Sequence, residues 1–196
     1  MKIKNEMKRI VVEDYSRRWP EQFQTLSAVY ANALHSLNCN IQHVGSTSVP
    51  GLAAKPVIDI DLIIDDRSKL AAGISTLSRL GYEHMGDMGI ADREAFKRLS
   101  PKTPRDGSDR EWPAHNLYVC IDGSVALRNH LALRDYLRAN PLKTKEYGAL
   151  KKNLAAENPF DMDLYIRNKT PFITEILKTV GFEEAELNSI RKANGA

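Results

Sequence analysis

The feature that most constrains the fold is an apolar run from Val57 to Ile64 that contains two acids, Asp59 and Asp61. So many branched aliphatic residues in succession predict a strand buried on both faces, near the middle of a sheet. Successive side chains of a strand alternate between faces, so Asp59 and Asp61 project to the same side. Unpaired carboxylates in such a strand are costly to bury, which favours a functional role for them.

A Gly-Ser turn comes shortly before this strand, in the segment His43-Val44-Gly45-Ser46-Thr47. Its backbone amides and the hydroxyls of Ser46 and Thr47 could hold phosphate oxygens, while Asp59 and Asp61 bind Mg²⁺. A Gly-Ser pair alone is common, and an Asp-x-Asp strand alone could be solvated or salt-bridged. In this order and at this spacing, the two together predict a site for Mg²⁺ and a nucleoside triphosphate (NTP).

The surrounding pattern predicts an α+β fold, with a small mixed sheet flanked by helices and a helical portion at the C-terminal end. We expect the α/β core over residues 1–125 and the helical segment, packed on it as a single compact unit, over residues 126–196. Helical periodicity covers about 20–37, 69–80, 126–139, 143–156 and the region from Pro171 onward. Strands are expected at 38–44, 57–64, 82–88 and 114–121, and an irregular excursion at 92–112.

Composition limits the class of protein and its location. The 196-residue chain carries a net charge of +3, which suits a polyanionic small molecule but does not indicate a nucleic-acid partner. Cys39 and Cys120 are too few for a disulfide framework or a zinc cluster. Residues 1–8 lack the apolar segment of a secretory signal, and no apolar run approaches the roughly 18 residues of a membrane span. We therefore expect a cytoplasmic protein without a membrane partner.

Several basic residues are candidates for binding phosphate. Lys55 lies four residues before Asp59. It could neutralise a triphosphate, or it could be a solvated loop lysine. Arg134 and Arg138 share one face of an expected helix and could clamp phosphate, or they could pair with Asp135 and Glu146. The neighbouring lysines 151 and 152 are interpreted as a solvated helix face.

The stretch from His43 to Asp61 resembles the nucleotidyltransferase superfamily, which includes polymerase-β-like and aminoglycoside-modifying enzymes. More specifically, it is similar to the GrpB family of bacteria, and further matching blocks cover nearly the whole chain. These blocks are Tyr15 with Trp19, His115–Val119, Leu133–Arg138, Tyr147–Leu154, and Lys169 with Phe172 and Ile173. The resemblance implies a nucleotidyltransferase-like fold and a transferase activity, in a family also found fused to dephospho-CoA kinase.

Enzymes of this superfamily usually take a third carboxylate from a neighbouring strand, and the matching strand here, 115–120, has no acid. It offers Asn116 and Tyr118 on one face and His115 on the other. His115 could ligate the metal or accept a proton, or it could be a hydrogen-bonded core histidine. Glu94 is a further candidate for the missing acid, with a surface salt bridge as its alternative.

Two hypotheses of different classes follow. The first is a Mg²⁺-dependent nucleotidyltransferase that moves a nucleoside monophosphate from an NTP to a small acceptor. In it, Asp59 and Asp61 bind metal, His115 assists, and Gly45, Ser46, Thr47, Lys55, Arg134 and Arg138 bind the nucleotide. The second is a nucleotide- or CoA-type ligand-binding module without turnover. A pure interaction module would leave the two strand acids unexplained.

Overall fold

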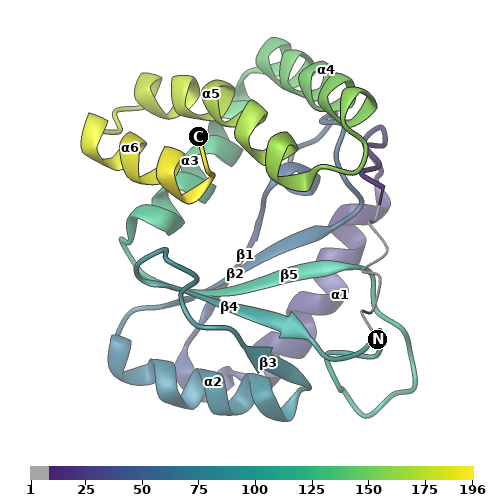
Figure 1. The fold of residues 1–196 in the computed structure, drawn as a ribbon. Coiled ribbons are helices and arrows are strands. Elements are labelled where there is room, and N and C mark those ends of the chain that lie inside the picture. Colours follow the sequence, from purple (N-terminus) through teal and green to yellow (C-terminus); the bar gives the residue numbers. More distant parts are fainter. Residues whose placement is uncertain (1–8) are drawn as a thin grey trace, which may run out of the picture.

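A five-stranded mixed sheet lies at the centre of the computed structural model, which describes residues 9–196 (Figure 1). The order across the sheet is β1-β2-β5-β4-β3, and β2 and β5 are parallel while the other neighbours are antiparallel. The strands are β1 (Asn40–Val44), β2 (Ile58–Ile64), β3 (Tyr82–His84), β4 (Arg93–Arg98) and β5 (His115–Ile121). The apolar run is thus a strand with neighbours on both sides, as its composition predicts.

Helices cover both faces of the sheet (Figure 1). They are α1 (Arg18–Ala33), α2 (Leu70–Arg79), α3 (Val125–Ala139), α4 (Pro141–Glu157), α5 (Met162–Thr179) and α6 (Glu184–Ala193). The main core joins α1 and α2 to one sheet face, through residues such as Leu26, Leu77 and Ile60. On the other face, Leu127 of α3 packs on Ile63 and Cys120. None of the helices within residues 9–196 is long and apolar enough to cross a bilayer.

The register of β2 and β5 determines which side chains face the C-terminal helices. Asp59 lies opposite Asn116, and Asp61 lies opposite Tyr118. Ile58, Ile60 and Leu62 alternate with the acids and enter the main core beside α1. Both acids therefore lie on the face that α3 covers.

Three elements differ from the sequence expectation. The excursion at 92–112 contains β4, an inner strand rich in charged residues that pairs with both β3 and β5. Helix α5 begins at Met162, not at Pro171, because Asp161 caps it by accepting from the Leu164 amide. Pro171 thus lies inside the helix rather than at its first turn. β3 also ends earlier than expected, at His84.

The expectation that the chain has no secretory signal concerns residues 1–8, which lie outside the described residues.

A polar network crosses the main core and holds His115. The His115 Nδ1–H donates to the Pro113 carbonyl at 2.8 Å, which leaves Nε2 to accept from the Tyr82 hydroxyl. The Tyr82 hydroxyl in turn contacts the Tyr30 hydroxyl. All three side chains are buried, and burial lowers the pKa of His115 to about 4. The histidine is therefore a neutral, satisfied core residue.

This network predicts a loss of stability in mild acid. The ordinary pKa of histidine is near 6.5, so between pH 6.5 and 4 the unfolded chain binds a proton that folded His115 does not. The free energy of unfolding should fall through this window as pH decreases, by up to about 3 kcal/mol from this residue. Urea unfolding at several pH values should show a weaker dependence for His115→Gln, and an unchanged one for the exposed control His35→Gln. Parallel curves for wild type and His115→Gln would contradict the assignment.

Candidate functional site

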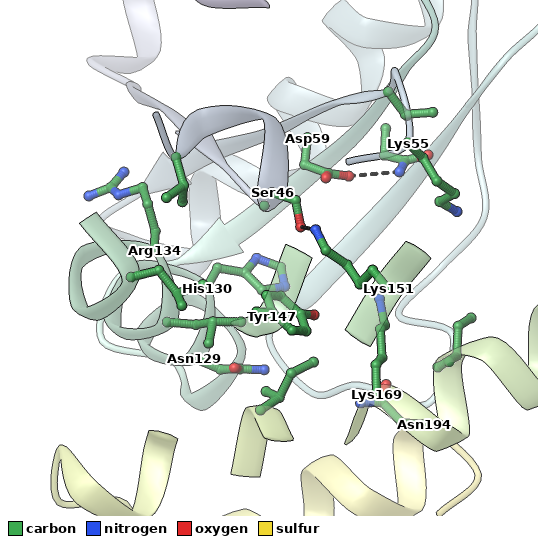
Figure 2. Close-up of a pocket in the computed structure, with 18 of the residues that line it drawn as sticks. Ser46, Lys55, Asp59, Asn129, His130, Arg134, Tyr147, Lys151, Lys169 and Asn194 are labelled. Atoms are coloured by element: carbon green, nitrogen blue, oxygen red, sulfur yellow. Dashed lines mark hydrogen bonds between the residues drawn. The ribbon is translucent and has the colours of Figure 1, made fainter. Parts of the chain in front are cut away.

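A cavity of about 330 Å³ lies between the acid-bearing face of the sheet and the C-terminal helices (Figure 2). This volume is within the range of small-molecule sites. Its walls come from the Gly45-Ser46 turn, β2, β5, α3, α4, α5 and the end of α6. The polar residues that line it are Ser46, Lys55, Asp59, Asn116, Tyr118, Asn129, His130, Arg134, Tyr147, Lys151, Tyr165, Lys169 and Asn194.

The Gly-Ser turn presses directly against the first acid. Gly45 has a φ of +67°, and a Cβ added there would lie 2.1 Å from Asp59 Oδ2, so no other residue fits this approach without a shift. A short 3₁₀ turn, Ser46–Ser48, follows, and the Ser48 hydroxyl donates to the Gly45 carbonyl at 2.7 Å. Thr47 is buried and donates to the Val57 carbonyl, so it shapes the loop and does not line the cavity.

The two acids have different surroundings. Asp59 lines the cavity and accepts from Asn116 Nδ2 at 2.7 Å, while burial raises the pKa of its carboxyl group. Asp61 is fully buried and accepts from His130 Nδ1 through Oδ2 at 2.8 Å. Its other oxygen, Oδ1, is buried without a hydrogen-bond partner among the described residues.

These carboxylates fit a divalent cation that takes few protein ligands. Mg²⁺ binds hard oxygen donors and usually keeps water or substrate phosphate in its remaining positions. The unpartnered Asp61 Oδ1 is an available donor of this kind. Within residues 9–196, no group of three or more His, Cys, Asp or Glu side chains forms a ready-made metal centre. A cation here would therefore take many of its ligands from the phosphates of a bound substrate or from water.

Three lysines give the cavity its positive charge. Lys151 is 2% exposed and donates from Nζ to the Ser46 hydroxyl at 2.8 Å, with its ammonium 4.6 Å from the centre of the Tyr147 ring. Burial, reinforced by neighbouring Lys169, lowers the pKa of Lys151 well below its ordinary value. Burial also lowers the pKa of Lys169 to about 8, and it lowers the pKa of Lys55. Cations that are desolvated in this way favour an anionic ligand.

The interpretation of Lys151 as a solvated residue is wrong. Helix α4 turns Lys151 inward, whereas Lys152 is exposed and pairs with Asp14. The spacing of Tyr147, Lys151 and Leu154 places the lysine on the apolar face of the helix, a signal that was available in the sequence. His130 was missed for another reason, because a single histidine on a predicted helix gives no indication that it contacts Asp61.

Neither candidate for the missing acid reaches the cavity. His115 lies in the main core, on the sheet face opposite Asp59, because its register partner is Ile58. Glu94 contacts His84 at 2.7 Å, and its register partner is Val119, another residue of the main core. Asn116 and Tyr118 are the residues of β5 that lie beside the two acids. The expectation that His115 or Glu94 assists at the site is thereby corrected.

The two arginines brace the turn. Arg134 lines the cavity, but its guanidinium donates to Gln42, to the His43 carbonyl and to Asp135. Arg138 lies outside the cavity lining and donates to the Ser48 carbonyl at 2.8 and 3.1 Å. Their donors are thus directed at the protein, and the expected phosphate clamp is not formed by Arg138.

Comparisons with known proteins agree with this architecture. A family model described as GrpB protein matches residues 9–179. The UPF0157 protein YqkA of Bacillus subtilis is 34% identical over 81% of this chain, and the chain spans 43% of that relative. The crystal structure of the conserved protein GrpB from Enterococcus faecalis has a TM-score of 0.71 and 33% identity, and it covers 93% of this chain and 98% of its own.

More distant similarities extend beyond these relatives. A Cid1 poly(U) polymerase bound to MgATP has a TM-score of 0.54 at 12% identity, over 78% of this chain and 46% of its own, which shows a shared fold. A protein named dephospho-CoA kinase, from Mycolicibacterium paratuberculosis, is 25% identical over 80% of this chain, which spans 42% of that protein.

The close approach of Gly45 to Asp59 predicts a position-specific cost of adding a methyl group. Gly45→Ala should lower the free energy of unfolding by at least about 2 kcal/mol more than Gly51→Ala, because overpacking adds to backbone strain. Gly51 is the matched control, since its φ is +79° and a Cβ there meets nothing within 4 Å. Urea unfolding of the two variants measures the difference, and equal losses would rule out the contact.

The buried ammonium of Lys151 predicts opposite effects on stability and binding. Lys151→Met keeps the length of the side chain and removes a desolvated charge, so the ligand-free protein should gain about 1–3 kcal/mol in its free energy of unfolding. Binding of inorganic triphosphate, measured by calorimetry, should be weakened at least about tenfold. The exposed control Lys152→Met should change both quantities little. A variant that is less stable yet binds triphosphate normally would contradict the assigned role.

Proposed function

The chain belongs to the GrpB family, and we propose that it is a Mg²⁺-dependent nucleotidyltransferase that moves a nucleoside monophosphate from an NTP to a small acceptor. The observation that carries the proposal is the contact between the Gly45-Ser46 turn and Asp59, within a cavity that one buried and two partly buried lysines make positive. The nucleotidyltransferase-like fold, shared with a polymerase bound to MgATP, supports it.

The residues divide into a phosphate side and a metal side. Ser46 and Lys151, joined by their hydrogen bond, face phosphate oxygens, and Lys55 and Lys169 add positive charge. Asp59 and Asp61 hold Mg²⁺, which when bound neutralises phosphate charge at the reacting centre. Asn116 and His130 fix the orientation of these two carboxylates through single hydrogen bonds.

The proposed reaction is a substitution at the α-phosphorus. An acceptor hydroxyl or amine forms the new bond to phosphorus, the bond to the β-phosphate oxygen breaks, and pyrophosphate leaves. The acceptor's proton passes to solvent. The lysines contribute by stabilising the charge that accumulates on the departing pyrophosphate.

A second candidate function is binding of a nucleotide- or CoA-type ligand without turnover. Two observations favour it: Asn116 and Tyr118 lie beside the acids where related enzymes use a carboxylate, and a relative is named dephospho-CoA kinase. A CoA-type ligand would use the same lysines for its phosphates. Release of pyrophosphate during incubation with Mg²⁺, an NTP and a panel of acceptors separates the two candidates, because only a transferase releases it.

The metal and phosphate assignment predicts ligand-dependent thermal stability. Mg²⁺ with an NTP at millimolar concentration should raise the melting temperature by several degrees, since a ligand that binds only the folded state stabilises it. The double variant Asp59→Asn, Asp61→Asn should show no such rise, whereas the exposed control Asp65→Asn should behave as wild type. Differential scanning fluorimetry measures the shift. The absence of any shift with all four NTPs would overturn the proposal.

A further inference from the structure

Two carboxamides lie in the cavity wall without a protein partner. Asn129 comes from α3, and Asn194 follows the last residue of α6. Both side chains are partly buried, and neither forms a side-chain hydrogen bond to any residue in the described part of the chain. In Figure 2 they lie at the opposite end of the cavity from Asp59 and Lys55. One end thus carries Asp59, and the other presents two carboxamides, with Lys169 beside Asn194.

We propose that Asn129 and Asn194 bind the polar edge of the nucleobase, so that the end of α6 sets base selectivity; this rests on the function proposed above. A carboxamide offers two donors and an acceptor in one plane, which matches the mixed donors and acceptors of a base edge. Leu133 and Ile173, which also line the cavity, provide apolar surface for the faces of a ring.

The chemistry of this end disfavours a cationic ligand group. Among residues 9–196, no aspartate or glutamate besides Asp59 lines the cavity, so a cationic ligand group would find no partner near the carboxamides. The positive charge comes from the three lysines and Arg134, and the arginine's donors are already directed at protein acceptors. A flat, hydrogen-bonding group such as a base fits the two carboxamides, next to Lys169.

Packing holds Asn194 at a defined place. Leu187 and Ile190 bury the inner face of α6 against α3 and α5. Glu183 and Glu186 form a capping box at its start, and Glu186 also pairs with Arg128 of α3. The Asn194 amide closes the helix by donating to the Ile190 and Arg191 carbonyls, which leaves its side chain available to the cavity. Positioning by helix packing is suited to selective recognition.

The test measures binding of each of the four NTPs, and of inorganic triphosphate, to the full chain with Mg²⁺ by calorimetry. Wild type should prefer one or two bases, and Asn129→Ala or Asn194→Ala should reduce that preference about three- to tenfold, the effect of one lost hydrogen bond. Affinity for inorganic triphosphate should remain unchanged in both variants. Asn188→Ala is the matched control, because Asn188 lies on the same helix, is exposed and does not line the cavity.

The outcomes separate this inference from the proposed function. If wild type binds all four NTPs equally, or if both variants keep the wild-type preference, base recognition by the carboxamides is wrong while nucleotide binding stands. If a variant loses triphosphate and NTP binding alike, its asparagine supports the fold of the site and the inference is also wrong. If wild type binds neither NTP nor triphosphate, the proposed function fails, and the inference fails with it.

Discussion

The pairing of β2 with β5 determines which side chains of the central strands face the cavity. Side chains alternate along both strands, so a shift of one residue in β2 would send Asp59 and Asp61 into the core beside Tyr30 and bring isoleucines to the cavity. The apolar residues that alternate with the acids resist that shift, because each is fully or almost fully buried against α1 and α2. Hydrophobic packing on one face of the sheet thereby fixes the chemistry on the other.

The site also imposes a cost on the fold. Lys151 is almost completely removed from water, and its neighbours Lys55 and Lys169 repel it. Asp61 keeps a buried oxygen without a partner. Such groups destabilise a protein unless something compensates them, and they concentrate where a ligand is bound. The surrounding α3, α4 and α5 offset the cost through a separate apolar cluster that includes Leu137, Tyr147 and Leu177.

Local sequence patterns predicted those site residues that lie close together in the chain. The Gly-Ser turn and the two acids lie on adjoining segments, and strand periodicity alone places both acids on one face. The residues that the sequence placed wrongly, or that it missed, are positioned by the tertiary structure. Whether His115 or Asn116 faces the acids is decided by how β5 aligns with β2, which no local pattern specifies. His130 and Lys169 reach the site only because α3 and α5 fold back over the sheet, and Glu94 was misjudged because β4 was not recognised as a strand.

The hydrogen bond between Lys151 and Ser46 joins residues 105 positions apart in the chain. A contact of such long range closes a large loop, so it ties the helical part of the chain to the sheet. A phosphate bound between these two side chains would therefore link α4 to the turn before β2 and slow the separation of the C-terminal helices from the sheet. Ligand occupancy of the cavity would then lower the unfolding rate and so lengthen the lifetime of the folded molecule.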